Sequence, residues 1–155
     1  MEVFVHTRGT DVEIQDPDPS TSVRDFAGLA GYPDAHVFLE GQEEALAPEA
    51  SLADAGVGER SNVHVGTCKK VTVSARYNQE TRSYEVPSAA TLESVYARAV
   101  SKGQGFGLGD SDQAQHTLQV QGATEQPDLS RHVGSFANDD CAAAFDLVMQ
   151  DRFQG

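Results

Sequence analysis

Residues 71–86 read VTVSARYNQETRSYEV, and this stretch predicts two β-strands joined by a tight turn. Apolar and polar residues alternate from Val71 to Tyr77 and again from Arg82 to Val86, as they do in strands with one buried face. The residues between them, Asn78 to Thr81, have the composition of a turn. Pro87 then closes the second strand, because it has no amide hydrogen to donate. We therefore expect a β-hairpin.

One helix and two further strands are predicted after this hairpin. Thr91 is a suitable N-cap, and an apolar helical face runs from it until Gly103 ends the helix: Leu92, Val95, Tyr96, Ala99 and Val100. A glycine-rich loop over 103–115 precedes a strand at 116–121. The segment 129–137 is irregular, and 142–149 supplies the last strand.

The first half of the chain has the same plan. Strands at 1–7 and 11–15 form a hairpin, and the prolines at 17 and 19 end it. A helix with N-cap candidates at 20–22 ends near Gly31 and Pro33, strands follow at 35–39 and 61–65, and 48–58 is turn-rich. Independent misreadings of two halves would not agree in order, so the duplication predicts two similar units, over 1–67 and 70–149, followed by a short tail at 150–155.

Size and charge agree with two small acidic units. A chain of 155 residues, 39% apolar and 23% charged, is long enough for two domains of roughly 70–80 residues. The formal net charge of −13 is uneven: 1–68 carries 13 acidic and 3 basic residues, and 69–155 carries 11 and 8. An acidic surface repels nucleic acid and anionic lipid. We expect protein partners, and neither nucleic acid nor a membrane.

We expect a cytoplasmic protein with reduced thiols. The sequence has no apolar run long enough for a membrane span and no basic-then-apolar amino terminus typical of a signal peptide. Cys68 and Cys141 lack C-x-x-C spacing and are too few for a disulfide framework, so buried free thiols are the first expectation and an interdomain disulfide the alternative.

A resemblance to ubiquitin occurs in both halves of the chain. In the first half it lies in SLADAGVGERSNVHV, residues 51–65; in the second it lies in LSRHV, residues 129–133, and AAAFDLVM, residues 142–149. The resemblance covers nearly the whole chain as a pattern, and it implies an α+β protein of two tandem ubiquitin-like β-grasp domains. The tail QDRFQG, residues 150–155, resembles the arginine-containing, glycine-terminated tail of ubiquitin.

Two domains with such a tail are similar to the interferon-induced two-domain modifier of vertebrates and to the bacterial antiphage modifiers of BilA type. Low lysine content and acidity favour the bacterial version. The resemblance implies conjugation through Gly155, with Arg152, Phe153 and Gln154 recognised in the tail. Glycine suits this role because it has no β-carbon to clash in a narrow channel. Ubiquitin has a second glycine where this chain has Gln154, which favours a dedicated activating enzyme.

The resemblance also implies the partners and the chemistry. They are an activating enzyme, a conjugating enzyme, a deconjugating protease and a target protein, for which a phage structural protein is one candidate. The modifier is itself no enzyme and holds no cofactor stably, because ATP and Mg²⁺ are used by the activating enzyme. The alternatives are a non-conjugated tandem ubiquitin-like adaptor and, with less support, a sulfur carrier, since such carriers are generally single domains.

Other residues are interpreted as structural. The five histidines have no metal-ligand spacing, and no metal site is expected. Gly103, Gly105, Gly107 and Gly109 follow a helix rather than lead into one, which favours a flexible loop over a phosphate site. Candidates for a partner surface on the last strands are Leu118, Val120 and Phe145, with core packing an equal alternative for each.

Overall fold

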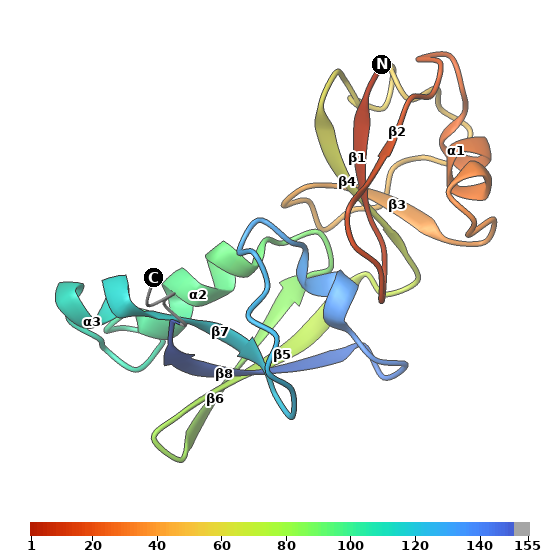
Figure 1. Cartoon of the computed structure of the whole chain (residues 1–155). Helices are drawn as coiled ribbons and strands as arrows, with labels where there is room; N and C mark the ends of the chain where they lie inside the picture. The colour runs from red at the N-terminus through yellow and green to blue at the C-terminus, as the bar shows by residue number, and fades with distance from the viewer. Residues whose placement is uncertain (151–155) are drawn as a thin grey trace.

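The computed structural model describes residues 1–150, and these form two units with the same strand order (Figure 1). The first unit has a four-stranded sheet in the order β2-β1-β4-β3. The central strands β1 and β4 are parallel, and β2 and β3 pair with them antiparallel at the edges. The elements are β1 (Val3–His6), β2 (Glu13–Gln15), α1 (Val23–Leu29), β3 (His36–Leu39) and β4 (Ser61–Gly66).

The second unit repeats this topology with the order β6-β5-β8-β7, and again the central pair, β5 and β8, is parallel. Its elements are β5 (Lys70–Tyr77), β6 (Glu80–Pro87), α2 (Leu92–Val100), α3 (Asp110–Gln115), β7 (His116–Val120), the 3₁₀ helix η1 (Val133–Phe136) and β8 (Ala142–Met149). The strand-strand-helix-strand-strand order in both units confirms the predicted α+β class with two ubiquitin-like β-grasp folds.

Two helices, α1 and α2, begin where the sequence predicts. The hydroxyl of Ser22 accepts a hydrogen bond from the Asp25 amide, and that of Thr91 accepts one from the Ser94 amide, so each caps the first turn of its helix. Just after α1, Gly31 has a φ of 94°, a left-handed conformation that glycine adopts without strain. Local sequence signals therefore set both helix starts.

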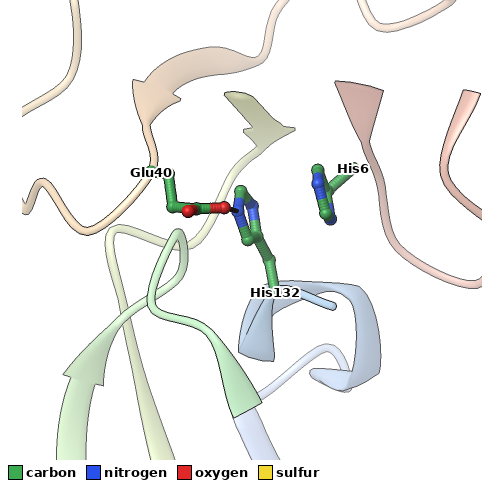
Figure 2. Close-up of side chains that lie close together, drawn as sticks. All are labelled: His6, Glu40 and His132. Atoms are coloured by element: carbon green, nitrogen blue, oxygen red, sulfur yellow. Dashed lines mark hydrogen bonds and ion pairs between the residues drawn. The ribbon is translucent and has the colours of Figure 1, made fainter. Parts of the chain in front are cut away.

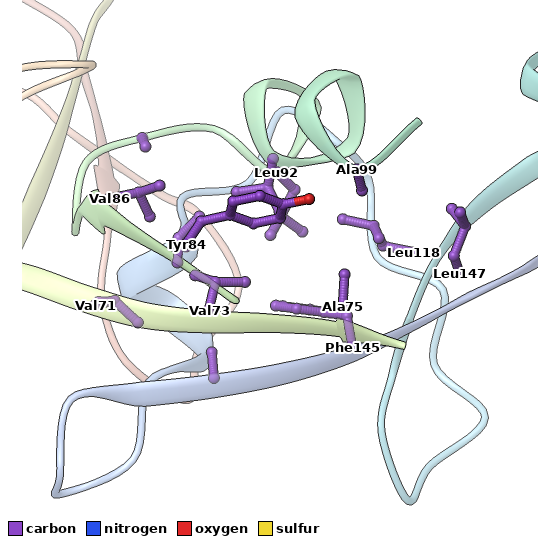
Figure 3. Packing of buried hydrophobic residues seen from close by; sticks show 14 of the residues in the cluster. Val71, Val73, Ala75, Tyr84, Val86, Leu92, Ala99, Leu118, Phe145 and Leu147 are labelled. Carbon is purple, nitrogen blue, oxygen red and sulfur yellow. The ribbon is translucent and has the colours of Figure 1, made fainter. Parts of the chain in front are cut away.

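Each unit has its own apolar core between one face of its sheet and its helix. In the second unit, Leu92 and Ala99 of α2 face side chains that rise from the sheet, including Phe145 (Figure 3). The core residues of β5 are every second residue, Val71, Val73 and Ala75, as the alternation in the sequence predicts. The opposite face of each sheet lies outside the core of its unit.

The glycine-rich segment is not the flexible loop that the sequence predicts. Residues Asp110–Gln115 form α3, and the preceding residues pack on α2: the amide of Phe106 donates to the Ala99 carbonyl, at 2.6 Å, and the amide of Leu108 to the Val100 carbonyl, at 2.9 Å. A β-carbon on Gly105 would lie 2.0 Å from the Ala99 carbonyl oxygen. Here glycine permits close packing against the helix rather than mobility.

The expectation of free thiols is wrong, because Cys68 and Cys141 form a disulfide. Cys68 lies just before β5 and Cys141 just before β8, two strands that run parallel in the same sheet. The bond therefore joins the beginnings of the central strands within the second unit. Periodicity could not reveal it, since the two positions lie 73 residues apart in the chain.

The two units also contact each other directly. The Gly9 amide donates to the Ser135 carbonyl, at 3.0 Å, and the Gly41 amide donates to the Ala89 carbonyl, at 2.8 Å. Ion pairs join Arg8 to Asp139, at 2.7 Å, and Glu43 to Lys70, at 2.5 Å. Within residues 1–150, no helix is long and apolar enough to cross a bilayer.

Candidate functional site

The carboxyl-terminal end of the second unit is held up to Gln150. Strand β8 lies between β5 and β7, so it is paired on both sides. After Met149, the Gln150 amide donates to the Gln115 carbonyl, at 2.7 Å, and the Gln150 side chain donates to the His116 carbonyl, at 3.2 Å. The residues predicted for conjugation and tail recognition, Gly155 with Arg152, Phe153 and Gln154, lie outside the described residues.

The open face of the second sheet is polar. Arg76 donates two hydrogen bonds to the Asp146 carboxylate, at 2.9 and 3.2 Å, and the Gln121 side chain donates to the same carboxylate, at 3.3 Å. The Arg76 side chain is 51% exposed and that of Asp146 19%, so the pair is half open to solvent at this face. This face can recognise a partner through polar and charged contacts.

The open face of the first sheet is covered in part by the second unit. Phe38, His6 and His64 share the face opposite the core residues of β1 and β4, since His6 lies beside His64 and Phe38 beside His64 in register. They are nevertheless 0–2% exposed. Gly134 of the second unit lies against His64. The docking of the units, rather than either core, buries these side chains.

Three histidines, which we call the histidine cluster, meet at this contact: His6 and His64 from the first unit and His132 from the second. The rings of His6 and His132 are stacked, with centroids 3.6 Å apart and planes at 11°. The ring of His64 is tilted against that of His132, with centroids 6.0 Å apart. As Figure 2 shows, the His132 ring lies between His6 and Glu40.

Hydrogen bonds hold one nitrogen of each stacked ring. Nε2 of His132 lies 2.8 Å from the Glu40 carboxylate, and Nε2 of His6 lies 2.9 Å from the Asn62 side-chain oxygen. In residues 1–150, the Nδ1 atoms of all three cluster histidines are buried without a hydrogen-bond partner. An unpartnered ring nitrogen tolerates burial when it is an unprotonated lone pair, whereas an N–H there loses its hydration.

Burial accordingly lowers the pKa of each cluster histidine. Burial is the main cause for His64, whose pKa falls to about 4, with repulsion from His6 added. Burial and then the other two rings lower the pKa of His132 to about 2. The pKa of His6 is lowered by burial and by Arg131, against an opposing hydrogen bond to Asn62. The cluster is neutral at pH 7.

His6, Glu40 and His132 offer three ligand atoms within 4.8 Å of one another, which raises the question of a metal ion. A zinc–imidazole bond is about 2.0–2.1 Å long, and the nitrogen lone pair lies in the ring plane. An ion shared by the stacked rings would lie about 1.8 Å out of each plane, half of their 3.6 Å separation. Two parallel rings therefore cannot both direct a lone pair at one ion. This arrangement does not fit a shared metal.

A family model described as BilA ubiquitin-like domain 2 matches residues 70–150, the whole of the second unit described above. The chain belongs to the BilA ubiquitin-like family. No curated protein matches the sequence.

In this BilA-type protein, the candidate partner-surface residues pack inward. Leu118 and Phe145 are both 0% exposed within the second core, and Val120 is half-buried against it. A partner surface needs exposed side chains, so the alternative of core packing holds for Leu118 and Phe145. The period-two pattern assigned each to one face but did not say which face was buried.

The histidine cluster of this BilA-type protein was not found from the sequence. His6 and His132 lie on different units, and spacing along one strand or loop carries no signal for a contact made by docking. Of the remaining two, His36 is exposed on β3, and Nδ1 of His116 lies 2.6 Å from the Asp112 carbonyl of α3. The sequence shows only that His132 and His64 fall in ubiquitin-like segments.

Proposed function

We propose that this chain is a protein modifier, attached through the carboxylate of Gly155 to an amine on a target protein. The observation that carries the proposal is membership of the BilA ubiquitin-like family together with the tandem β-grasp fold. The fold offers an anchored scaffold with a paired last strand. It does not itself need to perform chemistry, so we propose that the protein is not an enzyme.

The chemistry belongs to the partner enzymes. The Gly155 carboxylate attacks the α-phosphate of ATP on an activating enzyme, with Mg²⁺ holding the phosphates, and pyrophosphate leaves. A cysteine thiolate then displaces AMP to form a thioester. A conjugating enzyme passes the acyl group to an amine of the target, which forms an amide bond and releases the thiol. A deconjugating protease hydrolyses this amide bond with water, which returns the Gly155 carboxylate and the target amine.

The second unit supports this role by its geometry. Hydrogen bonds hold the second unit as far as Gln150. The five residues after Gln150 reach at most about 17 Å from it, which is their fully extended length. The activating enzyme must therefore approach the edge of the second unit near β7, α3 and the end of β8. The open face around Arg76 and Asp146 is a polar surface within that unit for recognition.

The first unit would add an acidic surface. Residues 1–68 carry 13 acidic and 3 basic side chains, and two of those basic residues, Arg8 and Arg24, are already paired with carboxylates. Unpaired acidic charge attracts basic surfaces and repels phosphate. We propose a bacterial cytoplasmic setting and a role in antiphage defence, with a phage structural protein as one candidate target.

Removal of the last residue tests the proposal. Full-length protein incubated with its cognate activating enzyme, ATP and Mg²⁺ should form a thioester that reductant cleaves, and adding the conjugating enzyme and target should give an adduct. The variant lacking Gly155 should form neither, and Lys102→Arg is the control that should behave as the full-length protein. An adduct that forms without Gly155 would refute the assignment.

A non-conjugated adaptor is the second candidate. The direct contact between the two units favours it, because this contact holds their surfaces together for a partner to bind. It predicts that a blocked carboxyl terminus leaves partner binding and function unchanged. A sulfur carrier, the third, would instead carry a thiocarboxylate on Gly155, which the intact mass after activation with a sulfur donor would reveal.

A further inference from the structure

We propose that the contact between the two units is an acid-sensitive latch: protonation of the histidine cluster separates the units and uncovers the open face of the first sheet. The inference rests on the structure of residues 1–150 and is independent of whether Gly155 is conjugated. The histidine cluster is His6, His64 and His132, and it spans the contact between the units.

The burial of the cluster depends on docking. The first core contains Val3, Val5, Val63 and Val65, which point away from His6 and His64 across the sheet. Neither histidine belongs to that core, yet both are 2% exposed, while His132 of the second unit is 0% exposed. Separation of the units returns the rings of His6 and His64 to an open sheet face, where water can solvate a charged imidazolium.

Among the described residues, a carboxylate faces only one member of the cluster, His132, so a proton on His6 or His64 has no carboxylate bonded to it. Glu40 is the one carboxylate bonded to the cluster in the described residues, and it already pairs with His132. Arg131 of the second unit lowers the pKa of His6, and Arg8 and His64 both line a cavity of about 230 Å³. These two arginines also form ion pairs, Arg8 with Asp139 and Arg131 with Asp11, and Lys70 pairs with Glu43 and Glu85.

The sign of the effect follows from the direction of the pKa shifts. The docked pKa of each cluster histidine lies below the usual value of 6.5. Docking is therefore fully stable above pH 6.5 and is lost as the pH falls below it, because the separated form binds protons that the docked form excludes. The docking constant falls up to tenfold per pH unit for each histidine, and for His64 this continues to about pH 4.

The chain permits a pivot rather than free diffusion of the units. Only residues 67–69 separate β4 from β5, and Cys68 within them is bound to Cys141. The motion available is rotation about the end of β4, near Gly66. It would separate the ring of His6 from that of His132 and uncover the face of the first sheet that His6 shares with His64.

Amide hydrogen exchange on the full-length chain measures the latch. The amides of Gly9 and Gly41 donate across the contact, so their protection factors report docking, while amides of the central strands β4 and β8 report the fold of each unit. Between pH 7.5 and 4.5, corrected for intrinsic exchange, protection at Gly9 and Gly41 should fall at least tenfold per pH unit below about 6.5. Protection in β4 and β8 should stay constant over the same range.

Two variants separate the latch from a general effect of acid. His64→Gln removes one titrating group and should make the decline about tenfold shallower per pH unit, whereas His36→Gln, a change at an exposed histidine of β3, should match the wild type. If the units of His64→Gln do not dock at pH 7.5, the pH dependence of protection at Gly9 and Gly41 in the wild type still tests the proposal. Protection at Gly9 and Gly41 that is constant with pH, or that falls together with β4 and β8, overturns the proposal.

Discussion

Gly134 and His64 touch across the contact between the units: a β-carbon on Gly134 would lie 2.5 Å from Nε2 of His64 and 2.9 Å from Cβ of Ser88. Real β-carbons do not approach other atoms this closely, so only glycine fits here. The close approach allows the backbone of η1 to cover the open face of the first sheet, and it makes residue 134 a sensitive probe of docking.

Gly134→Ala should weaken docking at neutral pH. The added methyl group displaces His64 or η1, at a cost of about 1–3 kcal/mol, typical of overpacked sites. Exchange protection at Gly9 and Gly41 should fall while that of β8 stays near wild type. Gly103→Ala is the matched control, because a β-carbon there meets nothing within 4 Å. Equal protection in both variants would contradict the close contact.

Loss of the disulfide should destabilise the second unit by about 4 kcal/mol, because the bond closes a loop of 73 residues in the unfolded chain. Urea unfolding of wild type with and without reductant should show this difference. The double variant Cys68→Ser, Cys141→Ser should unfold at the same urea concentration with and without reductant. Two free thiols found by alkylating the unreduced, unfolded wild type would show that the bond is absent.

Leu118→Ala should cost about 2–5 kcal/mol of unfolding free energy, because it removes buried methyl groups from a fully enclosed position. Val120→Ala, at the half-buried end of the same strand, should cost less. Urea denaturation of both variants measures the difference. If Leu118→Ala kept wild-type stability but lost partner binding, the residue would belong to a recognition surface after all.

Gln79→Gly should stabilise the second unit by about 1 kcal/mol. Asn78 and Gln79 both have positive φ, 49° and 68°, as the two-residue turn between β5 and β6 requires. A left-handed conformation costs an ordinary side chain roughly 1–2 kcal/mol, which glycine avoids, although its freer unfolded chain offsets part of the gain. Asn78→Gly should gain less, because asparagine tolerates this region. Thermal unfolding of both variants would test the order.

Much of the fold follows from short-range patterns. The alternation in 71–77 and 82–86 predicts β5 and β6, and the N-cap candidates at 20–22 and at Thr91 predict the helix starts. These are local effects, set by side-chain direction along a strand and by unpaired amides at a helix end. The structure of segment 103–115 could not be predicted in this way. From the local sequence its glycines indicate a loop, and their close packing against α2 becomes evident only when the position of that helix is known.

Less of the candidate site than of the fold could be predicted from the sequence. The polar face around Arg76 and Asp146 and the inward packing of Leu118 and Phe145 depend on which face of the sheet α2 covers. An alternating strand has two faces, and its pattern alone does not say which residues of mixed character, such as Val120, meet solvent. The placement of a helix on one side decides it.

The sequence by itself determined the order of strands and helices along each unit and the alternation that builds each core, because these depend on neighbours a few residues apart, and the resemblance to ubiquitin implied the β-grasp fold. The tertiary structure decided the Cys68–Cys141 bond, the stack of His6 on His132 and the neutral state of that cluster. Those features come from residues far apart in the chain that only packing brings together, and burial there changes the free energy of charge and of contact in ways that no local pattern encodes.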